Sequence, residues 1–185
     1  MQVRTLIFSG LFSALVGTCL PALFVSGPAF AQAAAPAAGK EPTLLKQNGD
    51  WAAYSHGSGA AKQCFAMTTP KTKSPANLNH GDVFFFVSNR PAENIRMEPS
   101  ILVGYNFQEN SKVVVDIDGQ KFNLFTKGDG AWVESAPQEA ALIAAMKKGK
   151  AMKVAGTSGR GNPTGYTFSL SGISATLADV AKACP

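Results

Sequence analysis

Residues 164–184 read TGYTFSLSGISATLADVAKAC. In the first third of this stretch, Tyr166, Phe168 and Leu170 alternate with polar residues, which predicts a strand with one buried face. Ser171-Gly172 ends that alternation. Apolar residues then recur at helical spacing, at Ile173, Leu177 and Val180, and Ser171 or Ser174 could cap the start of a helix. We therefore expect a strand followed by a short amphipathic helix, which ends at Cys184.

The first 31 residues have the pattern of a secretory signal peptide. Arg4 is followed by an uncharged apolar run, and Ala29-Phe30-Ala31 places small residues at the positions that a signal peptidase reads. The less favoured alternative is a retained membrane anchor, since about 20 apolar residues can span a bilayer. We expect cleavage after Ala31, a periplasmic or secreted protein, and no transmembrane span in the mature chain.

The remaining sequence fits one domain. Residues 32–43 are rich in Ala and Pro and predict a flexible tether, and residues 44–185 have the length of a single folded domain. Cleavage removes Arg4 from the 17 basic residues, so the mature chain keeps 16 basic against 12 acidic residues, a net charge of +4.

Two of the three cysteines, Cys64 and Cys184, lie in the mature chain. An even number of cysteines in an exported protein predicts a disulfide between them. A redox-active pair is the alternative, but no Cys-x-x-Cys spacing is present to lower a thiol pKa.

Most of the region between the cysteines predicts strands. Residues 83–87, VFFFV, form a continuous apolar run that favours a central strand with both faces covered. Asp118-Gly119 between two strand-like runs predicts a tight hairpin, and Asp129-Gly130 predicts a second turn. Residues 71–81 are expected to form a loop. This pattern predicts an antiparallel β-sandwich with one or two short helices.

One helix is expected after residue 135. Ser135-Ala-Pro-Gln138 matches a capping box with proline in the first turn. An apolar stripe follows at Leu142, Ile143 and Met146, and Lys147-Lys148-Gly149 is typical of a helix C-terminus.

The sequence offers no clear catalytic or metal-binding pattern. His56 and His80 fall in expected loops, without ligand partners at metal-like spacing, and we interpret both as solvated. No carboxylate pair suggests an acid–base couple, since Asp116, Asp118 and Asp129 lie where turns need them, and no Gly-x-Ser-x-Gly turn is present. We therefore expect no enzyme activity and no cofactor; a hydrolase using His56 or His80 is the least favoured alternative.

Two features could bind a partner. The segment Gly156–Gly165 resembles a phosphate-binding loop, but Asn162 replaces the required lysine, so we expect an interstrand loop in which Arg160 could be an exposed contact.

A basic cluster follows the expected helix, at Lys147, Lys148, Lys150 and Lys153. It could attract an anionic lipid or protein surface, although a solvated helix end explains half of it. Nucleic acid is not an expected partner. An aromatic glycan-binding platform is a further alternative, but Trp51 and Trp132 are expected in the core.

The chain resembles the invasion-associated locus B family in an ordered set of short motifs spread over nearly the whole mature domain. They are Trp51, Cys64-Phe-Ala, Pro70, Phe86–Pro91, Gly104-Tyr105, Phe122–Phe125, Ala131-Trp132, Ala145–Gly149, Gly156–Gly161, Ser169–Gly172 and Cys184. One departure is at His56, in the region where some relatives carry a further cysteine.

The resemblance implies an exported bacterial envelope protein with an immunoglobulin-like β-sandwich and no established enzyme activity or ligand. We expect a non-enzymatic binding domain whose partner is an unknown protein or an envelope or host surface. A periplasmic accessory or inhibitor of an envelope enzyme is the alternative, and the sequence does not indicate an oligomeric state.

Overall fold

The computed structural model describes residues 41–185, and the expected signal peptide and most of the expected tether lie outside this range. The strands are β1 (Thr43–Asn48), β2 (Trp51–His56), β3 (Gln63–Thr68), β4 (Thr72–Ser74), β5 (Phe84–Arg90), β6 (Ile95–Leu102), β7 (Lys112–Ile117), β8 (Gln120–Lys127), β9 (Gly130–Val133), β10 (Ala151–Thr157) and β11 (Pro163–Ser169). The helices are α1 (Ala136–Lys148) and α2 (Ile173–Ala183), with short 3₁₀ turns at Gly59–Ala61 and Pro91–Glu93.

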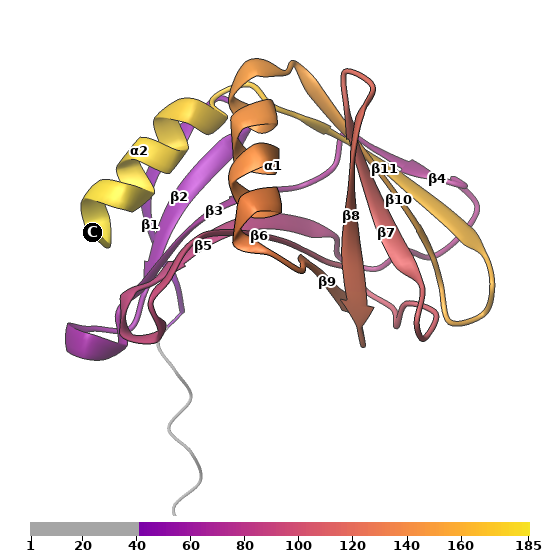
Figure 1. The fold of residues 1–185 in the computed structure, drawn as a ribbon, viewed down its shortest axis with the longest axis horizontal. Helices are drawn as coiled ribbons and strands as arrows, with labels where there is room; N and C mark the ends of the chain where they lie inside the picture. Colours follow the sequence, from indigo (N-terminus) through magenta and orange to yellow (C-terminus); the bar gives the residue numbers. More distant parts are fainter. Residues whose placement is uncertain (1–40) are drawn as a thin grey trace, which may run out of the picture. The chain divides into compact units, whose positions relative to one another are not determined.

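All eleven strands belong to one antiparallel sheet in the order β1-β2-β3-β5-β6-β9-β8-β7-β10-β11-β4 (Figure 1). The expected fold class, mainly β and antiparallel with two short helices, is confirmed. The strands are not divided into two separately bonded sheets, because β9 pairs with both β6 and β8 and so links the two halves. The sheet bends, and its halves face each other across the core: Phe85 on β5 packs against Phe168 on β11, with ring centroids 5.8 Å apart.

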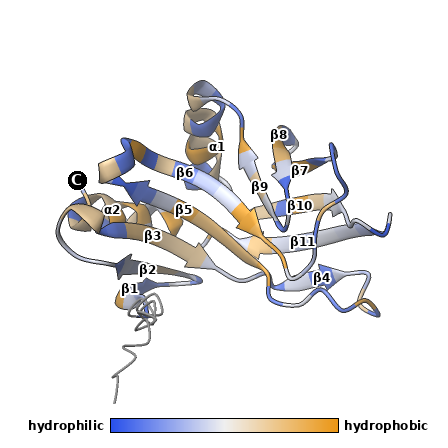
Figure 2. Cartoon of the chain, turned by 90° about the horizontal axis from the view of Figure 1, so that it is seen from below, coloured by the Kyte–Doolittle hydropathy of each residue, from blue (hydrophilic) through white to orange (hydrophobic). Residues whose placement is uncertain are grey.

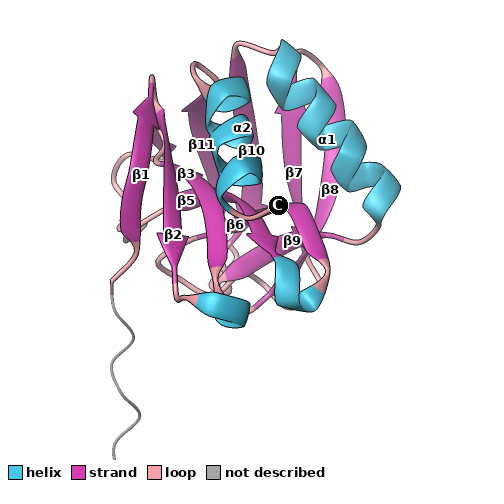
Figure 3. Cartoon of the chain, turned by 90° about the vertical axis from the view of Figure 1, so that its left-hand side faces the viewer, coloured by secondary structure: helices cyan, strands magenta, loops and turns pink. Residues whose placement is uncertain are grey.

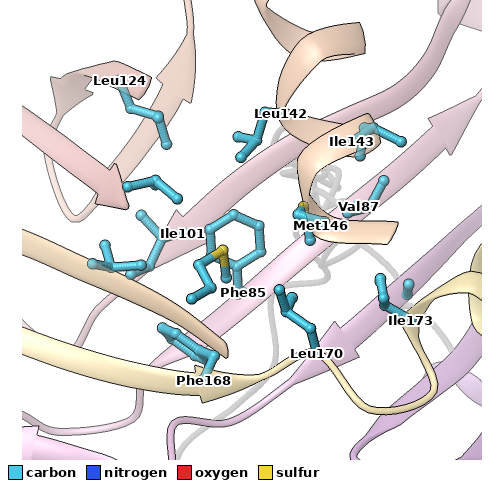
Figure 4. Close-up of a cluster of buried hydrophobic side chains, with 14 of the residues drawn as sticks. Phe85, Val87, Ile101, Leu124, Leu142, Ile143, Met146, Phe168, Leu170 and Ile173 are labelled. Carbon is cyan, nitrogen blue, oxygen red and sulfur yellow. The ribbon is translucent and has the colours of Figure 1, made fainter. Parts of the chain in front are cut away.

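Both helices pack on the inner, concave face of this sheet (Figure 3). α2 covers β1, β2 and β3, and α1 covers β6, β8 and β9. Their apolar stripes enter one core with the inner residues of the strands, as the close-up in Figure 4 shows for Leu142, Met146, Phe85 and Ile173. Burying large side chains of this kind stabilises a fold by roughly 1.5–3 kcal/mol each.

The C-terminal glycine expected for the first helix is confirmed, since Gly149 is the C-cap of α1, but the expected side-chain caps at the two helix N-termini are not formed. Ser135 is the N-cap of α1, but its side chain makes no capping hydrogen bond. The N-cap of α2 is Gly172, in the left-handed conformation at φ 93°, and not Ser171 or Ser174. Glycine is needed there because a Cβ at position 172 would lie 1.8 Å from the carbonyl oxygen of Asn48.

Of the two turns and the loop expected between strands, one turn is found as expected, the other is shifted by one residue, and the loop contains a strand. The Asp118-Gly119 hairpin is confirmed, with φ of 52° and 86° at these two residues. The second turn is one residue earlier than expected, at Gly128-Asp129, and Gly130 already belongs to β9. The expected loop 71–81 contains a short strand, β4, which pairs with β11.

The run 83–87 lies in a central strand, but the expectation that both its faces are covered is wrong. Phe85 is fully buried on the inner face, whereas Phe84 and Phe86 point to the outer face and are half-buried. Trp132, expected in the core, is also half-buried on the outer face, where it packs against Phe125. Trp51 is buried as expected. Strands β3, β5 and β6 run side by side with hydrophobic residues along them (Figure 2).

The disulfide joins Cys64 on β3 to Cys184, the residue after α2, with the two Cα atoms 5.8 Å apart. Both cysteines are buried. The side chain of Asn89 on β5 donates a hydrogen bond to the carbonyl oxygen of Cys184, and Lys62 donates one to that of Ala183. The end of α2 is thus held to the inner face of the sheet by one covalent and two polar contacts.

Candidate functional site

A polar cavity of about 570 Å³ opens where three segments that connect strands come together. These segments are the loop before β5, the loop after β6 and the turn between β10 and β11. The lining residues are Leu78, Asn79, His80, Gly104, Tyr105, Asn106, Ser158, Gly159, Arg160, Asn162 and Thr164. The volume lies within the range of roughly 300–1,000 Å³ that is common for small-molecule sites.

The first two segments are held together by a close backbone approach at two glycines. Gly81 has φ 60°, and a Cβ there would lie 2.8 Å from the Cα of Gly104. The Gly104 N–H donates a hydrogen bond to the His80 carbonyl oxygen. Side chains at either glycine would push the two segments apart, so both glycines keep His80 next to Tyr105.

The β10–β11 turn is rigid for its length. The Ser158 N–H donates to the carbonyl oxygen of Asn162, the Gly161 N–H donates to that of Ser158, and the Ser158 hydroxyl accepts from the Asn162 N–H. The Gly159 N–H donates to the carbonyl oxygen of Asn106 at 2.8 Å, which ties the turn to the second segment. Arg160 is therefore carried at the cavity on a supported turn. Strands flank this turn on both sides, so it is not a phosphate-binding loop that opens a helix.

A chain of hydrogen bonds orders one wall of the cavity, to which His80, Tyr105 and Thr164 contribute, while Tyr166 links them without lining the cavity. His80 Nε2 lies 2.9 Å from the Pro75 carbonyl oxygen, and His80 Nδ1 lies 3.0 Å from the Tyr166 hydroxyl. The Tyr105 hydroxyl lies 2.8 Å from that of Tyr166 and 2.7 Å from that of Thr164. Each side chain fixes its neighbour, so the wall presents polar groups in set positions.

His80 is therefore buried and bonded through both ring nitrogens, and its expected solvation is wrong. His56 lies at the end of β2 and is partly exposed. The His80 contacts could not be predicted from the sequence, because Pro75 and Tyr166 lie in different segments of the chain. Burial, reinforced by the hydrogen bond with Tyr105, raises the pKa of Tyr166 above its ordinary value of 10. Tyr166 thus stays protonated at neutral pH.

The expected binding residues do not form one surface. Arg160 is exposed and lines the cavity. Lys147 and Lys148 are exposed in the last turn of α1, and Lys147 lines a separate groove with Arg96 and Glu139. Lys153 is on the outer face of β10, since Met152 and Val154 on either side of it are buried.

Lys150 is exposed in the short link between α1 and β10. The basic cluster is therefore divided between helix and sheet, and its binding to an anionic surface stays a prediction.

The described residues contain neither a metal-binding cluster nor a membrane-spanning helix. Within residues 41–185, no group of three or more His, Cys, Asp or Glu side chains is arranged to hold a metal ion. In the same part of the chain, none of the helices has both the length and the apolar character required to cross a bilayer.

Fold and site together define a disulfide-linked, mainly β domain with a polar cavity between connecting segments. Residues 51–181 match the family model described as Invasion associated locus B (IalB) protein, and the chain belongs to this family. Gly104-Tyr105 and the Gly156–Gly161 stretch, two segments on which the sequence resemblance rests, contribute residues to the cavity.

One solved structure with the same fold is described as invasion associated protein b from Bartonella henselae. It has a TM-score of 0.52 and 15% sequence identity, and the alignment covers 75% of this chain and 96% of that one. The comparison with curated proteins gives no match.

Proposed function

We propose that this chain is an exported bacterial envelope protein that acts by binding, without catalysis, and that the polar cavity is its ligand site. The observation that carries the proposal is the cavity wall, in which His80, Tyr105 and Thr164 are already ordered by hydrogen bonds to one another and to the buried Tyr166. A wall that is ordered before binding reduces the entropy that a ligand must lose.

The wall supports binding better than acid–base catalysis. A general base needs a free lone pair within reach of the substrate. The His80 nitrogens already contact Pro75 and Tyr166, and Tyr166 retains its proton at neutral pH. None of the residues that line the cavity is an Asp or Glu.

Export is supported by the N-terminal sequence and by the buried disulfide. A disulfide persists in an oxidising compartment such as the periplasm. Cell fractionation and intact mass measurement test this part of the proposal. We expect a periplasmic or secreted species that begins at Gln32 and has no free thiol; full-length protein in the cytoplasm with both thiols reduced would contradict it.

Ligand binding is tested by native mass spectrometry of the mature protein recovered from the periplasm without denaturation. Asn106 lines the cavity and is exposed, so Asn106→Trp should fill the entrance without disturbing the core. Asn123, exposed on the outer face of β8, provides the matched control Asn123→Trp. We expect a small-molecule adduct in the wild type and in Asn123→Trp, and its loss in Asn106→Trp. An adduct of equal abundance in all three proteins, or no adduct in any of them, would refute the cavity as the ligand site.

A further inference from the structure

The charge of the cavity indicates what kind of molecule it holds. Arg160 is the charged residue in its lining, and no carboxylate there balances it. None of the ion pairs formed within residues 41–185 includes Arg160. A guanidinium offers five N–H donors in a planar fork that matches the geometry of a carboxylate or a phosphate.

The uncharged lining groups also include donors. The side-chain amides of Asn106 and Asn162 line the same cavity as Arg160. Across the described part of the chain, neither amide takes part in a side-chain hydrogen bond, whereas Asn79 already accepts one from the Gly81 N–H. Two amides and a guanidinium around one cavity form a donor-rich surface, which suits a ligand with several acceptor oxygens.

The hydrogens available along the buried wall bear on the charge of the cavity. Five contacts run from Pro75 through His80, Tyr166, Tyr105 and Thr164 to the Gly156 carbonyl oxygen. A neutral imidazole and three hydroxyls supply only four hydrogens, so one contact is left without a hydrogen. A second proton on the His80 ring supplies the fifth.

With that proton, the His80 ring donates in both directions, from Nε2 to the Pro75 carbonyl oxygen and from Nδ1 into the series of hydroxyls. His80 Nδ1–H then donates to Tyr166, Tyr166 to Tyr105, Tyr105 to Thr164, and Thr164 to the Gly156 carbonyl oxygen at 3.2 Å. The positive charge on His80 would share the cavity with that of Arg160. The other ionisable neighbours are Lys73 on β4, which donates to the Gly81 carbonyl oxygen, and the exposed Asp82.

We propose that the cavity binds a small organic anion, carrying a carboxylate or a phosphate, through Arg160, and that the anion is bound together with one proton on His80. This inference rests on the proposed function and names the class of its ligand. The anion compensates the charges of Arg160 and of protonated His80, since no carboxylate lines the cavity, and the proton supplies the missing hydrogen of the wall.

Matched probes test the anion. Glucuronate and glucose are alike in size and differ in a carboxylate, and glucose 6-phosphate presents a phosphate on the same ring. Titration calorimetry of the mature protein should show binding of at least one of the two anions and at least 10-fold weaker binding of glucose. The anion that binds more tightly shows whether the cavity prefers a carboxylate or a phosphate.

Two variants separate a specific contact from general attraction. Arg160→Gln should weaken anion binding about 10-fold or more, as expected for a charged hydrogen bond. Lys121→Gln removes the same charge from the outer face of β8 and should leave the affinity unchanged. Equal weakening in both variants, or no binding of either anion at millimolar concentration, would overturn the proposal.

The proton is measured separately. Calorimetry at pH 7 in two buffers that differ in ionisation enthalpy should show uptake of up to one proton per anion, and the ¹⁵N shifts of the His80 ring should move to the doubly protonated values. Binding without proton uptake would overturn the part of the proposal that concerns His80. A native adduct that proves to be a neutral molecule would overturn the anion while leaving the proposed binding function intact.

Discussion

Removal of the Cys64–Cys184 disulfide should cost this domain a large fraction of its stability without changing its fold. The bridge closes a loop with a sequence separation of 120 residues. Cross-linking a loop of that length lowers the entropy of the unfolded chain, which corresponds to about 5 kcal/mol at 25 °C. Native domains of this size are stable by roughly 5–15 kcal/mol, so the effect is easily measured.

The packing of α2 limits how much stability the domain loses when the disulfide is removed. Ile173, Leu177 and Val180 remain buried against the sheet when the bridge is absent. Asn89 and Lys62 still bond the last carbonyl groups of the chain. We therefore expect the protein without the bridge to fold, with its free energy of unfolding lower by about 3–5 kcal/mol.

Urea unfolding of the oxidised wild type and of Cys64→Ala/Cys184→Ala provides the measurement. Replacing both residues avoids a lone buried thiol, and alanine avoids burying two hydroxyls. The slope of the free energy against urea concentration should be larger in the variant, because its unfolded chain is less compact and exposes more surface. A loss below about 1 kcal/mol with an unchanged slope would refute the entropic account, since the packing of α2 would then provide nearly all of the restraint.

Three further outcomes follow from the structure. The folded protein raises the pKa of Tyr166 above 10, so the protonated hydroxyl stabilises the fold below pH 10 and this stabilisation is lost as the pH rises further. In urea unfolding measured between pH 8 and 11, Tyr166→Phe should therefore lose less stability at the alkaline end than the wild type does. Gly172→Ala should lower the free energy of unfolding by roughly 3 kcal/mol or more, because its Cβ would overlap the Asn48 carbonyl oxygen. Gly161→Ala, also at positive φ but in open space, should lower it by only about 1 kcal/mol. Equal losses would show that backbone strain at positive φ, and not the contact with Asn48, causes the loss. Phe85→Ala should lower the melting temperature sharply, through a loss of about 3–5 kcal/mol, and a loss under 1 kcal/mol would contradict the central position of Phe85 in the core.

The local elements of the fold could be predicted because their signals lie close together in the sequence. The alternation at Tyr166, Phe168 and Leu170 and the hairpin at Asp118-Gly119 were both found where expected. The pairing of the two cysteines depended only on their number. These features require no knowledge of which segments meet in space.

Exposure of the outer face could not be predicted, because an aromatic run looks alike in a covered and in an open strand. Phe86 is shielded by Phe65 on the neighbouring strand, with ring centroids 5.7 Å apart, and not by a helix or second sheet. Trp132 is shielded by Phe125 in the same way. Side-chain packing across strands therefore substitutes for a covering layer, and only the strand order reveals it.

The candidate site was harder still to predict from sequence. Arg160 was identified as a possible contact because it lies in a glycine-rich turn. The group that orders the cavity wall, His80, gave no pattern at all, since Tyr166 is 86 positions away. Buried polar networks are assembled from distant segments, and no local periodicity marks them.

The position of β1 and β4 at the two ends of the strand order has a consequence for aggregation. An end strand exposes unpaired backbone groups to which another molecule can add a strand. β1 carries a bulge between Leu44 and Lys46, and Lys46 places a charge on this edge. β4 is three residues long, and Pro75 follows it without an N–H to donate. Both features hinder the addition of a further strand to the ends of the sheet, which lowers its tendency to grow into fibres.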